Sequence, residues 1–188
     1  MRSNSYWSEE EKNMAHDEYS GCVPAGEEKT VTVEYLYLDL QTCRRCIGTD
    51  VVLEEALAEV APALKAAGYR MDYRKVEITS ARLARQYRFL SSPTILVNGH
   101  DICPVVRENA CGCCSGISGT AVDCRVFEYE GETYEVPPKR MLAEAILRGA
   151  FAPAAAESCG CYTLPENLSA FFEGKINQSC CSSQDGCC

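Results

Sequence analysis

Stretches with the hydrophobic period of a β-strand alternate with stretches that have the period of a helix over residues 30–149. Apolar residues recur at every second position in a half-buried strand, and at every third or fourth position on the buried face of a helix. The resulting order is strand, helix, strand, helix, strand, hairpin and helix. This order predicts an α/β sandwich with a parallel first half, because two strands joined by a helix run in the same direction.

The predicted strands are short and are bounded by turn residues. They cover residues 31–38, 69–78 and 94–97, and a hairpin joins 126–129 to 133–136. β-Branched and aromatic residues are frequent in these stretches, as is typical of buried strands. Asn98 and Gly99 predict a tight turn directly after the third strand.

The predicted helices have apolar stripes and recognisable ends. In the first helix, Thr49 or Asp50 is the expected N-cap and Gly68 the expected C-terminal cap. Pro62 lies inside this helix, so we expect the helix axis to bend there. The other predicted ends are Ser80 for a short second helix, and Pro138 and Gly149 for the last helix.

Three stretches depart from this pattern. Residues 1–29 are charged and have no apolar period, which predicts a flexible leader. Residues 103–124 are rich in cysteine, glycine and serine, and they form a predicted insertion within the domain. Residues 150–188 are a predicted flexible, cysteine-rich tail with one short helix at 165–174.

Cysteine is strongly enriched, with 14 cysteines, 2 histidines and a net charge of −9 in 188 residues. The sequence shows neither a membrane-length apolar run nor a secretion signal, so we expect a cytoplasmic protein. In a reducing compartment, many cysteines indicate redox catalysis or soft-metal binding rather than permanent disulfides. With so few histidines, any metal would be held mostly by sulfur. The negative charge disfavours nucleic acids and anionic membranes as partners.

Cys43 and Cys46 come directly after the first predicted strand and at the start of a helix. A step of three residues places both sulfurs on the same side of a helical turn. The N-terminus of a helix stabilises a thiolate, so Cys43, at the outer position, is the expected nucleophile. Arg44 and Arg45 would stabilise this thiolate further and contact a substrate. Alternatively, the two arginines simply form a solvated helix start.

Residues 81–99 resemble the stretch of thioredoxins and glutaredoxins that runs from a helix through a cis-proline loop to a strand. The resemblance implies a thioredoxin-like fold, with Pro93 in the cis form and facing the Cys-x-x-Cys motif as part of the catalytic site. It also implies that the Ser92 backbone is free to pair with a substrate strand, and that Ser92 and Thr94 line the substrate site. The alternative is a trans proline that opens an ordinary strand.

The chain departs from the thioredoxin pattern at the motif itself. Thr42 stands where thioredoxins have tryptophan, and Arg44 and Arg45 replace their Gly-Pro pair. The reductase activity of thioredoxins therefore does not transfer with the fold. The whole chain looks closest to a functionally uncharacterised, cysteine-rich branch of thioredoxin-like proteins, which supplies no activity to carry over.

The insertion and the tail contain further candidate metal ligands. Cys111 and Cys114, together with Cys103 or Cys124, could be among the four thiolates that hold a zinc ion. The same cysteines could instead resolve disulfides passed on from the motif, or be free thiols. In the tail, close cysteine pairs resemble the clusters that hold arsenic(III), mercury(II) or copper(I), although the tail could equally have no function. The candidate ligands are Cys103, Cys111, Cys113, Cys114 and Cys124 in the insertion, and Cys180, Cys181, Cys187 and Cys188 in the tail.

Two functions follow from these features. The first is a thiol-disulfide oxidoreductase that requires no cofactor and acts on a protein or small-molecule disulfide, with Cys43 attacking and Cys46 resolving. The second is a non-enzymatic protein that binds or delivers a soft metal or metalloid ion, such as zinc, through its thiolates. The proline loop favours the first function, which is the leading hypothesis. The high cysteine content favours the second.

Overall fold

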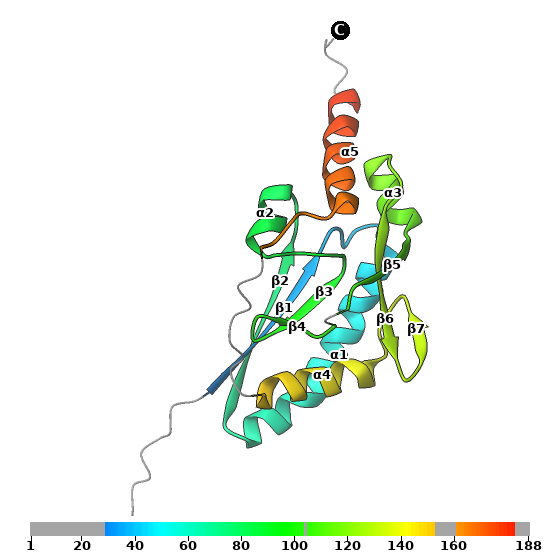
Figure 1. The fold of residues 1–188 in the computed structure, drawn as a ribbon. Coiled ribbons are helices and arrows are strands. Elements are labelled where there is room, and N and C mark those ends of the chain that lie inside the picture. The colour runs from blue at the N-terminus through cyan, green and yellow to red at the C-terminus, as the bar shows by residue number, and fades with distance from the viewer. Residues whose placement is uncertain (1–28, 104, 153–160, 183–188) are drawn as a thin grey trace, which may run out of the picture.

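The computed structural model describes residues 29–103, 105–152 and 161–182, which form two sheets and five helices (Figure 1). The larger sheet has the order β2-β1-β3-β4. The central strand β1 (Lys29–Tyr37) pairs in parallel with β2 (Tyr69–Glu77) and antiparallel with β3 (Thr94–Val97). The two-residue strand β4 (His100–Asp101) extends the sheet beyond β3. The strands and the parallel first half that the sequence predicts are therefore confirmed, with ends shifted by one or two residues.

Helix α1 (Arg44–Ala66) connects β1 to β2 and buries its apolar stripe against the larger sheet. Its N-cap is Cys43, so the predicted N-cap at Thr49 or Asp50 is wrong. The apolar period predicts too short a helix. The first two turns of α1 are buried through Arg45, Cys46 and Thr49, which do not continue the apolar stripe. Pro62 lies inside the helix, which continues past it, and Gly68 follows the helix end with a positive φ of 80°.

The loop before β3 has the features that the sequence predicts. Ser80 accepts a hydrogen bond from the Leu83 backbone N–H and caps α2 (Ala81–Gln86). The Ser92–Pro93 peptide bond is cis, which confirms the conformation that the resemblance implies. After β3, Asn98 and Gly99 both have positive φ and form the predicted tight turn.

A second sheet, β5-β6-β7, stands beside the first turns of α1 (Figure 1). Strand β6 (Asp123–Tyr129) pairs antiparallel with β5 (Arg107–Ala110) on one side and with β7 (Glu132–Tyr134) on the other. The predicted hairpin is β6-β7, and β5 was not predicted. All four residues of β5 are exposed and polar or small, so the strand has no apolar alternation to recognise. The segment predicted as an insertion thus contributes a strand of the second sheet.

Three further helices complete the described structure. Helix α4 (Lys139–Phe151) packs along α1, and α5 (Glu166–Ser182) packs along α3 (Gly112–Ser118) (Figure 1). Helix α4 runs two residues beyond the predicted end at Gly149, and α5 runs well beyond the predicted 165–174. The apolar stripe of α5 is short because its later turns leave the core, as the 63% exposure of Ile176 indicates.

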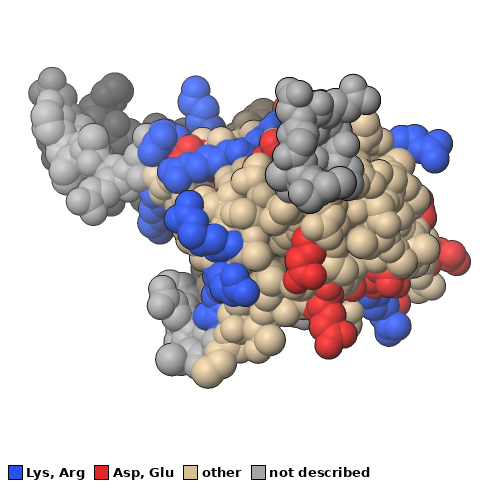
Figure 2. Space-filling view, turned by 90° about the horizontal axis from the view of Figure 1, so that it is seen from above, with Lys and Arg blue, Asp and Glu red and all other residues tan. Residues whose placement is uncertain are grey.

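The described helices include none that is long and apolar enough to cross a membrane. Figure 2 shows that basic and acidic side chains gather on different parts of the face seen from above. The net charge of −9 therefore describes the whole chain and not each part of its surface.

Candidate metal centre

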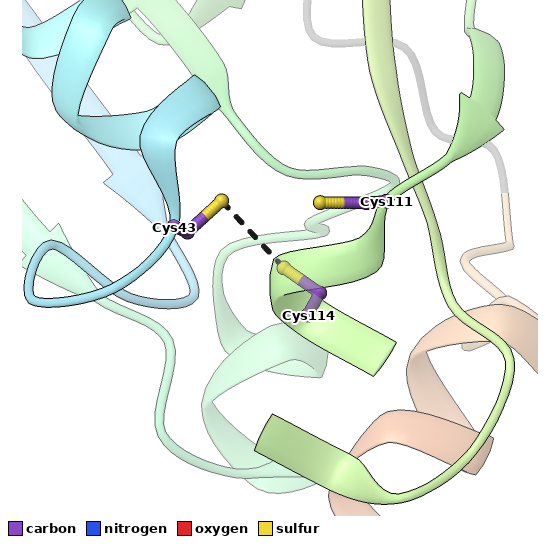
Figure 3. A group of neighbouring side chains, drawn as sticks. All are labelled: Cys43, Cys111 and Cys114. Atoms are coloured by element: carbon purple, nitrogen blue, oxygen red, sulfur yellow. Dashed lines mark hydrogen bonds between the residues drawn. The ribbon is translucent and has the colours of Figure 1, made fainter. Parts of the chain in front are cut away.

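Cysteine sulfurs from three separate segments meet near the N-terminus of α1. The Sγ atoms of Cys43, Cys111 and Cys114 all lie within 4.8 Å of one another (Figure 3). The Sγ of Cys114 is 3.7 Å from that of Cys43 and 3.3 Å from that of Cys124. We call these four residues the cysteine cluster. Cys46 lies one turn into α1, and its sulfur is 3.4 Å from the Ser92 hydroxyl.

Cys43 is held in place by a turn built on Asp39. One carboxylate oxygen of Asp39 accepts hydrogen bonds from the backbone N–H groups of Gln41, Thr42 and Cys43, at 3.1, 2.6 and 2.9 Å. Burial by itself would raise the pKa of Asp39, but these N–H groups lower it below its ordinary value. The turn therefore fixes the backbone of Cys43 directly before the helix begins. Asp39 was not among the predicted site residues, although an Asp directly before a turn is a signal for such side-chain hydrogen bonds to the backbone.

Helix α3 and strand β6 supply the other three sulfurs. Cys111 follows β5 as the N-cap of α3, and Cys114 lies three residues later on the same side of the helix. The backbone N–H of Cys111 donates to the Val122 carbonyl at 2.9 Å, which closes the connection between β5 and β6. Cys124 lies on β6, opposite Asn109 of β5. The pairing of β5 with β6 thus brings Cys124 beside α3.

The cluster is enclosed by apolar side chains. Cys43, Cys46, Cys114 and Cys124 have no exposed surface, and Cys111 is 5% exposed. Leu168 and Phe171 of α5 belong to the same apolar core, so α5 helps to cover the sulfurs. The cysteines whose side chains are described are free thiols: Cys43, Cys46, Cys103, Cys111, Cys113, Cys114, Cys124 and Cys161.

Hydrogen bonds among the sulfurs favour thiolates at two positions. The neighbouring thiols of Cys111, Cys114 and Cys124 lower the pKa of Cys43 below its ordinary value. Hydrogen bonds from Cys114 and Cys124 lower the pKa of Cys111 to about 6. The hydrogen bond to Cys43, together with burial, raises the pKa of Cys46. The hydrogen bond with Cys111 raises the pKa of Cys114, and hydrogen bonds with Cys111 and Cys114 raise that of Cys124. The cluster therefore favours the thiolate, which is the form that binds metal, at Cys43 and Cys111.

The two arginines of the motif lie in different environments. The Arg45 side chain is buried and donates to the Cys124 carbonyl, to Asn109 and to Glu135, each at 2.7 Å. Arg45 therefore fastens the start of α1 to the second sheet. Arg44 is exposed. Of the two, Arg44 is the one that can meet a ligand from solvent.

The proline loop lies against Cys46 but is not open to a substrate strand. The Ser92 hydroxyl is 3.4 Å from the Cys46 sulfur, and Pro93 and Thr94 are buried. The Ser92 carbonyl accepts a hydrogen bond from the backbone N–H of Arg125 at 2.7 Å. The expectation that the Ser92 backbone is free is therefore wrong at this carbonyl. The protein's own strand β6 occupies the position, which the sequence could not show because residues 92 and 125 are far apart along the chain.

The remaining predicted ligands lie elsewhere or outside the described residues. Cys103 lies beside the ion pair of Asp101 and Arg125, and burial raises its pKa to about 11. Cys113 faces a surface pocket on the outer side of α3. Cys180 and Cys181 fall in the last turns of α5, and Cys187 and Cys188 lie outside the described residues. Of the leader predicted at 1–29, residues 1–28 also lie outside them, and Lys29 is the first residue of β1. Of the two predicted combinations, Cys111 and Cys114 are brought together with Cys124 and not with Cys103, and Cys43, which was predicted as a redox residue, joins them.

A family model described as Domain of unknown function (DUF2703) matches residues 31–146. The match includes every residue of the cysteine cluster. Neither a curated protein nor a solved structure matches the chain.

Proposed function

The chain belongs to the DUF2703 family, and from the sulfur geometry of this domain we propose that it binds a thiophilic metal or metalloid ion in the cysteine cluster. One observation carries the proposal: three buried sulfurs, from Cys43, Cys111 and Cys114, lie within 4.8 Å of one another. These residues are separated by up to 71 positions in the chain. Packing alone would bring apolar side chains together here, whereas converging thiols are the donors that soft ions prefer.

The distances between the sulfurs are those that four thiolates around one metal ion require. A tetrahedral zinc ion with Zn–S bonds of about 2.3 Å requires sulfurs about 3.8 Å apart. The sulfurs of Cys43 and Cys114 are 3.7 Å apart. Cys43, Cys111 and Cys114 are therefore proposed as three ligands, and Cys124, whose sulfur contacts Cys114, as the fourth.

The surroundings support a soft ion over a hard one. Magnesium and calcium require several oxygen ligands, and magnesium usually retains water. The cluster offers sulfur, and three of its four cysteines have no exposed surface. Burial also makes thiolate charge costly unless a cation balances it. An ion such as zinc(II), arsenic(III), mercury(II) or copper(I) would supply this balance.

A thiol-disulfide oxidoreductase is the second candidate. It is supported by the position of Cys43 at the start of α1, by the contact of Cys46 with the Ser92 loop, and by the β2-β1-β3-β4 order, which agrees with a thioredoxin-like fold. The Cys43 thiolate would attack a substrate disulfide and release one thiolate. Cys46 would then release the second thiolate, leaving a Cys43–Cys46 disulfide that an external dithiol must reduce. The burial of both sulfurs and the hydrogen bond from β6 to Ser92 rank this candidate below ion binding.

Ion titrations of the reduced full chain test the proposal. Zinc(II) and arsenite are added under anaerobic conditions, and bound ions are counted by native mass spectrometry. We expect one tightly bound ion, which is lost or at least about 100-fold weaker in Cys43→Ser, Cys111→Ser and Cys114→Ser, since even changes outside the ligand set cost about 10- to 100-fold. Cys161→Ser, which changes an exposed cysteine, is the matched control and should bind normally.

Two further variants separate the alternatives. Cys46→Ser should keep the tightly bound ion under the proposal, and should abolish disulfide turnover under the oxidoreductase candidate. A variant with serine at Cys180, Cys181, Cys187 and Cys188 should also keep the ion. Binding that disappears only with the tail cysteines, or turnover that depends on Cys46 without ion binding, would contradict the proposal.

A further inference from the structure

A surface pocket opens onto the one edge of the cysteine cluster that reaches the surface. Arg44, Cys111, Gly112, Cys113 and Glu135 contribute to its lining. Its volume is about 640 Å³, within the usual range of small-molecule sites. We call it the access pocket. Cys111 is the cluster residue with exposed surface, at 5%, while the other three have none, so the pocket meets the cluster at Cys111.

Cys113 lies at this opening and is not part of the cluster. It is half-buried, and it falls between Cys111 and Cys114 along α3. Helical residues three apart share a side, so Cys111 and Cys114 point inward together while Cys113 points in another direction. The chain therefore places one accessible thiol next to two enclosed ligands.

We propose that Cys113 is the docking thiol that receives the ion from a small anionic thiol carrier and passes it to Cys111 and the rest of the cluster. This inference rests on the proposed function and adds a route and a carrier class to it. The exposed Arg44 would attract the negative charge of the carrier, in a chain that is otherwise acidic. Arg45, which also lines the pocket, is held by Glu135 and keeps the pocket wall in place.

The transfer is a series of ligand exchanges without oxidation or reduction. Cys113 forms a bond from sulfur to the ion, one carrier thiolate leaves, and that thiolate takes up the proton that Cys113 gives up. Cys111 and then Cys114 and Cys43 displace the remaining carrier thiolates and finally Cys113 in the same way. The ion keeps its oxidation state, and the number of bonds from sulfur to the ion is maintained at each exchange.

Transfer kinetics test the docking thiol. Reduced apo full chain is mixed with arsenite or zinc(II) held by excess glutathione, a small thiol that carries carboxylates, and loading is followed in time. We expect Cys113→Ser to slow loading at least about tenfold, because a nearby thiol no longer captures the ion first. Its final occupancy and affinity should equal those of the unchanged chain.

A second variant narrows the opening without touching a thiol. A Cβ added at Gly112 meets no atom within 4 Å, so Gly112→Phe starts in open space at the pocket wall and should also slow loading. Arg44→Ala should slow loading from glutathione by about threefold and leave loading from neutral mercaptoethanol unchanged, because only the first carrier is steered by charge. Cys103→Ser changes a half-buried cysteine outside the pocket and is the matched control.

The possible failures are distinct. If Cys113→Ser loads at the normal rate, the ion enters by another route and the docking thiol is refuted, while the proposed function stands. If Cys113→Ser loses affinity, Cys113 is a permanent ligand and the inference is likewise refuted. If the unchanged chain binds no ion at all, the proposed function fails and the inference fails with it.

Discussion

The two sheets contribute to the cysteine cluster in different ways. The larger sheet and α1 form an apolar sandwich and present Cys43 and Cys46 at the start of a helix, as an open dithiol would be presented. The second sheet, with α3 and α5, is tied on by polar contacts and encloses that start. Its ties include the Arg45 side chain and the hydrogen bond from Arg125 to the Ser92 carbonyl.

This difference shows how a covering region can change the chemistry of a motif. A dithiol at a helix start is nucleophilic when it is open to a substrate. We call the second sheet, together with α3 and α5, the cover. It adds Cys111, Cys114 and Cys124, buries the sulfurs of Cys43 and Cys46, and donates a hydrogen bond to the Ser92 carbonyl. This arrangement favours ion binding over thiol-disulfide exchange with a substrate. The predictions that follow therefore perturb the cover, the cluster and the start of α1.

The largest expected effect comes from removing an apolar anchor of the cover. Phe171→Ala deletes a fully buried ring of α5 and should lower the free energy of unfolding by about 4 kcal/mol, as large core truncations do. It should also expose the cluster, so that alkylation of Cys43 becomes faster. Chemical denaturation and mass-spectrometric labelling measure the two effects. Ile176→Ala, at a 63% exposed position of the same helix, should change neither.

Ion binding should stabilise the chain through the cluster. At a free ion concentration of 100 times the dissociation constant, one site raises the free energy of unfolding by about 2.7 kcal/mol. Thermal or chemical denaturation with and without zinc(II) measures this gain, and a chelator should reverse it. Cys114→Ser should remove the gain. An equal gain in this variant would place the stabilising ion outside the cluster.

The Arg45 side chain, which joins α1 to the second sheet, should contribute somewhat less to the free energy of unfolding. Arg45→Met keeps the length of the side chain but removes its hydrogen bonds to Cys124, Asn109 and Glu135. We expect a loss of about 2 kcal/mol in the free energy of unfolding, since hydrogen bonds from charged groups contribute about 1.5–3 kcal/mol. Ion affinity should also fall, by about 10- to 100-fold. Arg44→Met, at the exposed neighbour, should preserve both stability and equilibrium affinity.

The turn before Cys43 should show the smallest effect. Asp39→Ala removes the acceptor of three backbone N–H groups and should cost about 1 kcal/mol of unfolding free energy, as the loss of a helix cap does. Asp39→Asn keeps a carbonyl acceptor and should retain most of the stability. Equal losses in the two variants would show that the charge of Asp39, rather than its hydrogen-bond geometry, holds the turn.

The sequence was sufficient for the regular part of the larger sheet. The apolar period located β1, β3 and the stripe of α1. Ser80 correctly marked the N-cap of α2, and Asn98 the turn after β3. These features depend on residues close together in the chain, so a local pattern can report them.

Local sequence patterns could not predict the cover or the complete cysteine cluster. Strand β5 is exposed along its whole length, so no alternation marks it. The spacing of Cys111 and Cys114 did predict a shared site, but Cys43 joins them only through polar ties such as Arg45 to Cys124, which span 79 positions. Burial through Arg45 and Thr49 likewise hid the first turns of α1, because polar residues give no hydrophobic signal.

X-ray absorption spectroscopy at the zinc edge identifies the atoms that bind the ion. It is measured on the reduced full chain loaded with one equivalent of zinc(II). We expect three or four sulfur neighbours at about 2.3 Å, and a loss of this sulfur shell when Cys43, Cys111 and Cys114 are replaced by serine. A shell of nitrogen and oxygen donors, or a sulfur shell that persists in the triple variant, would contradict ion binding in the cysteine cluster.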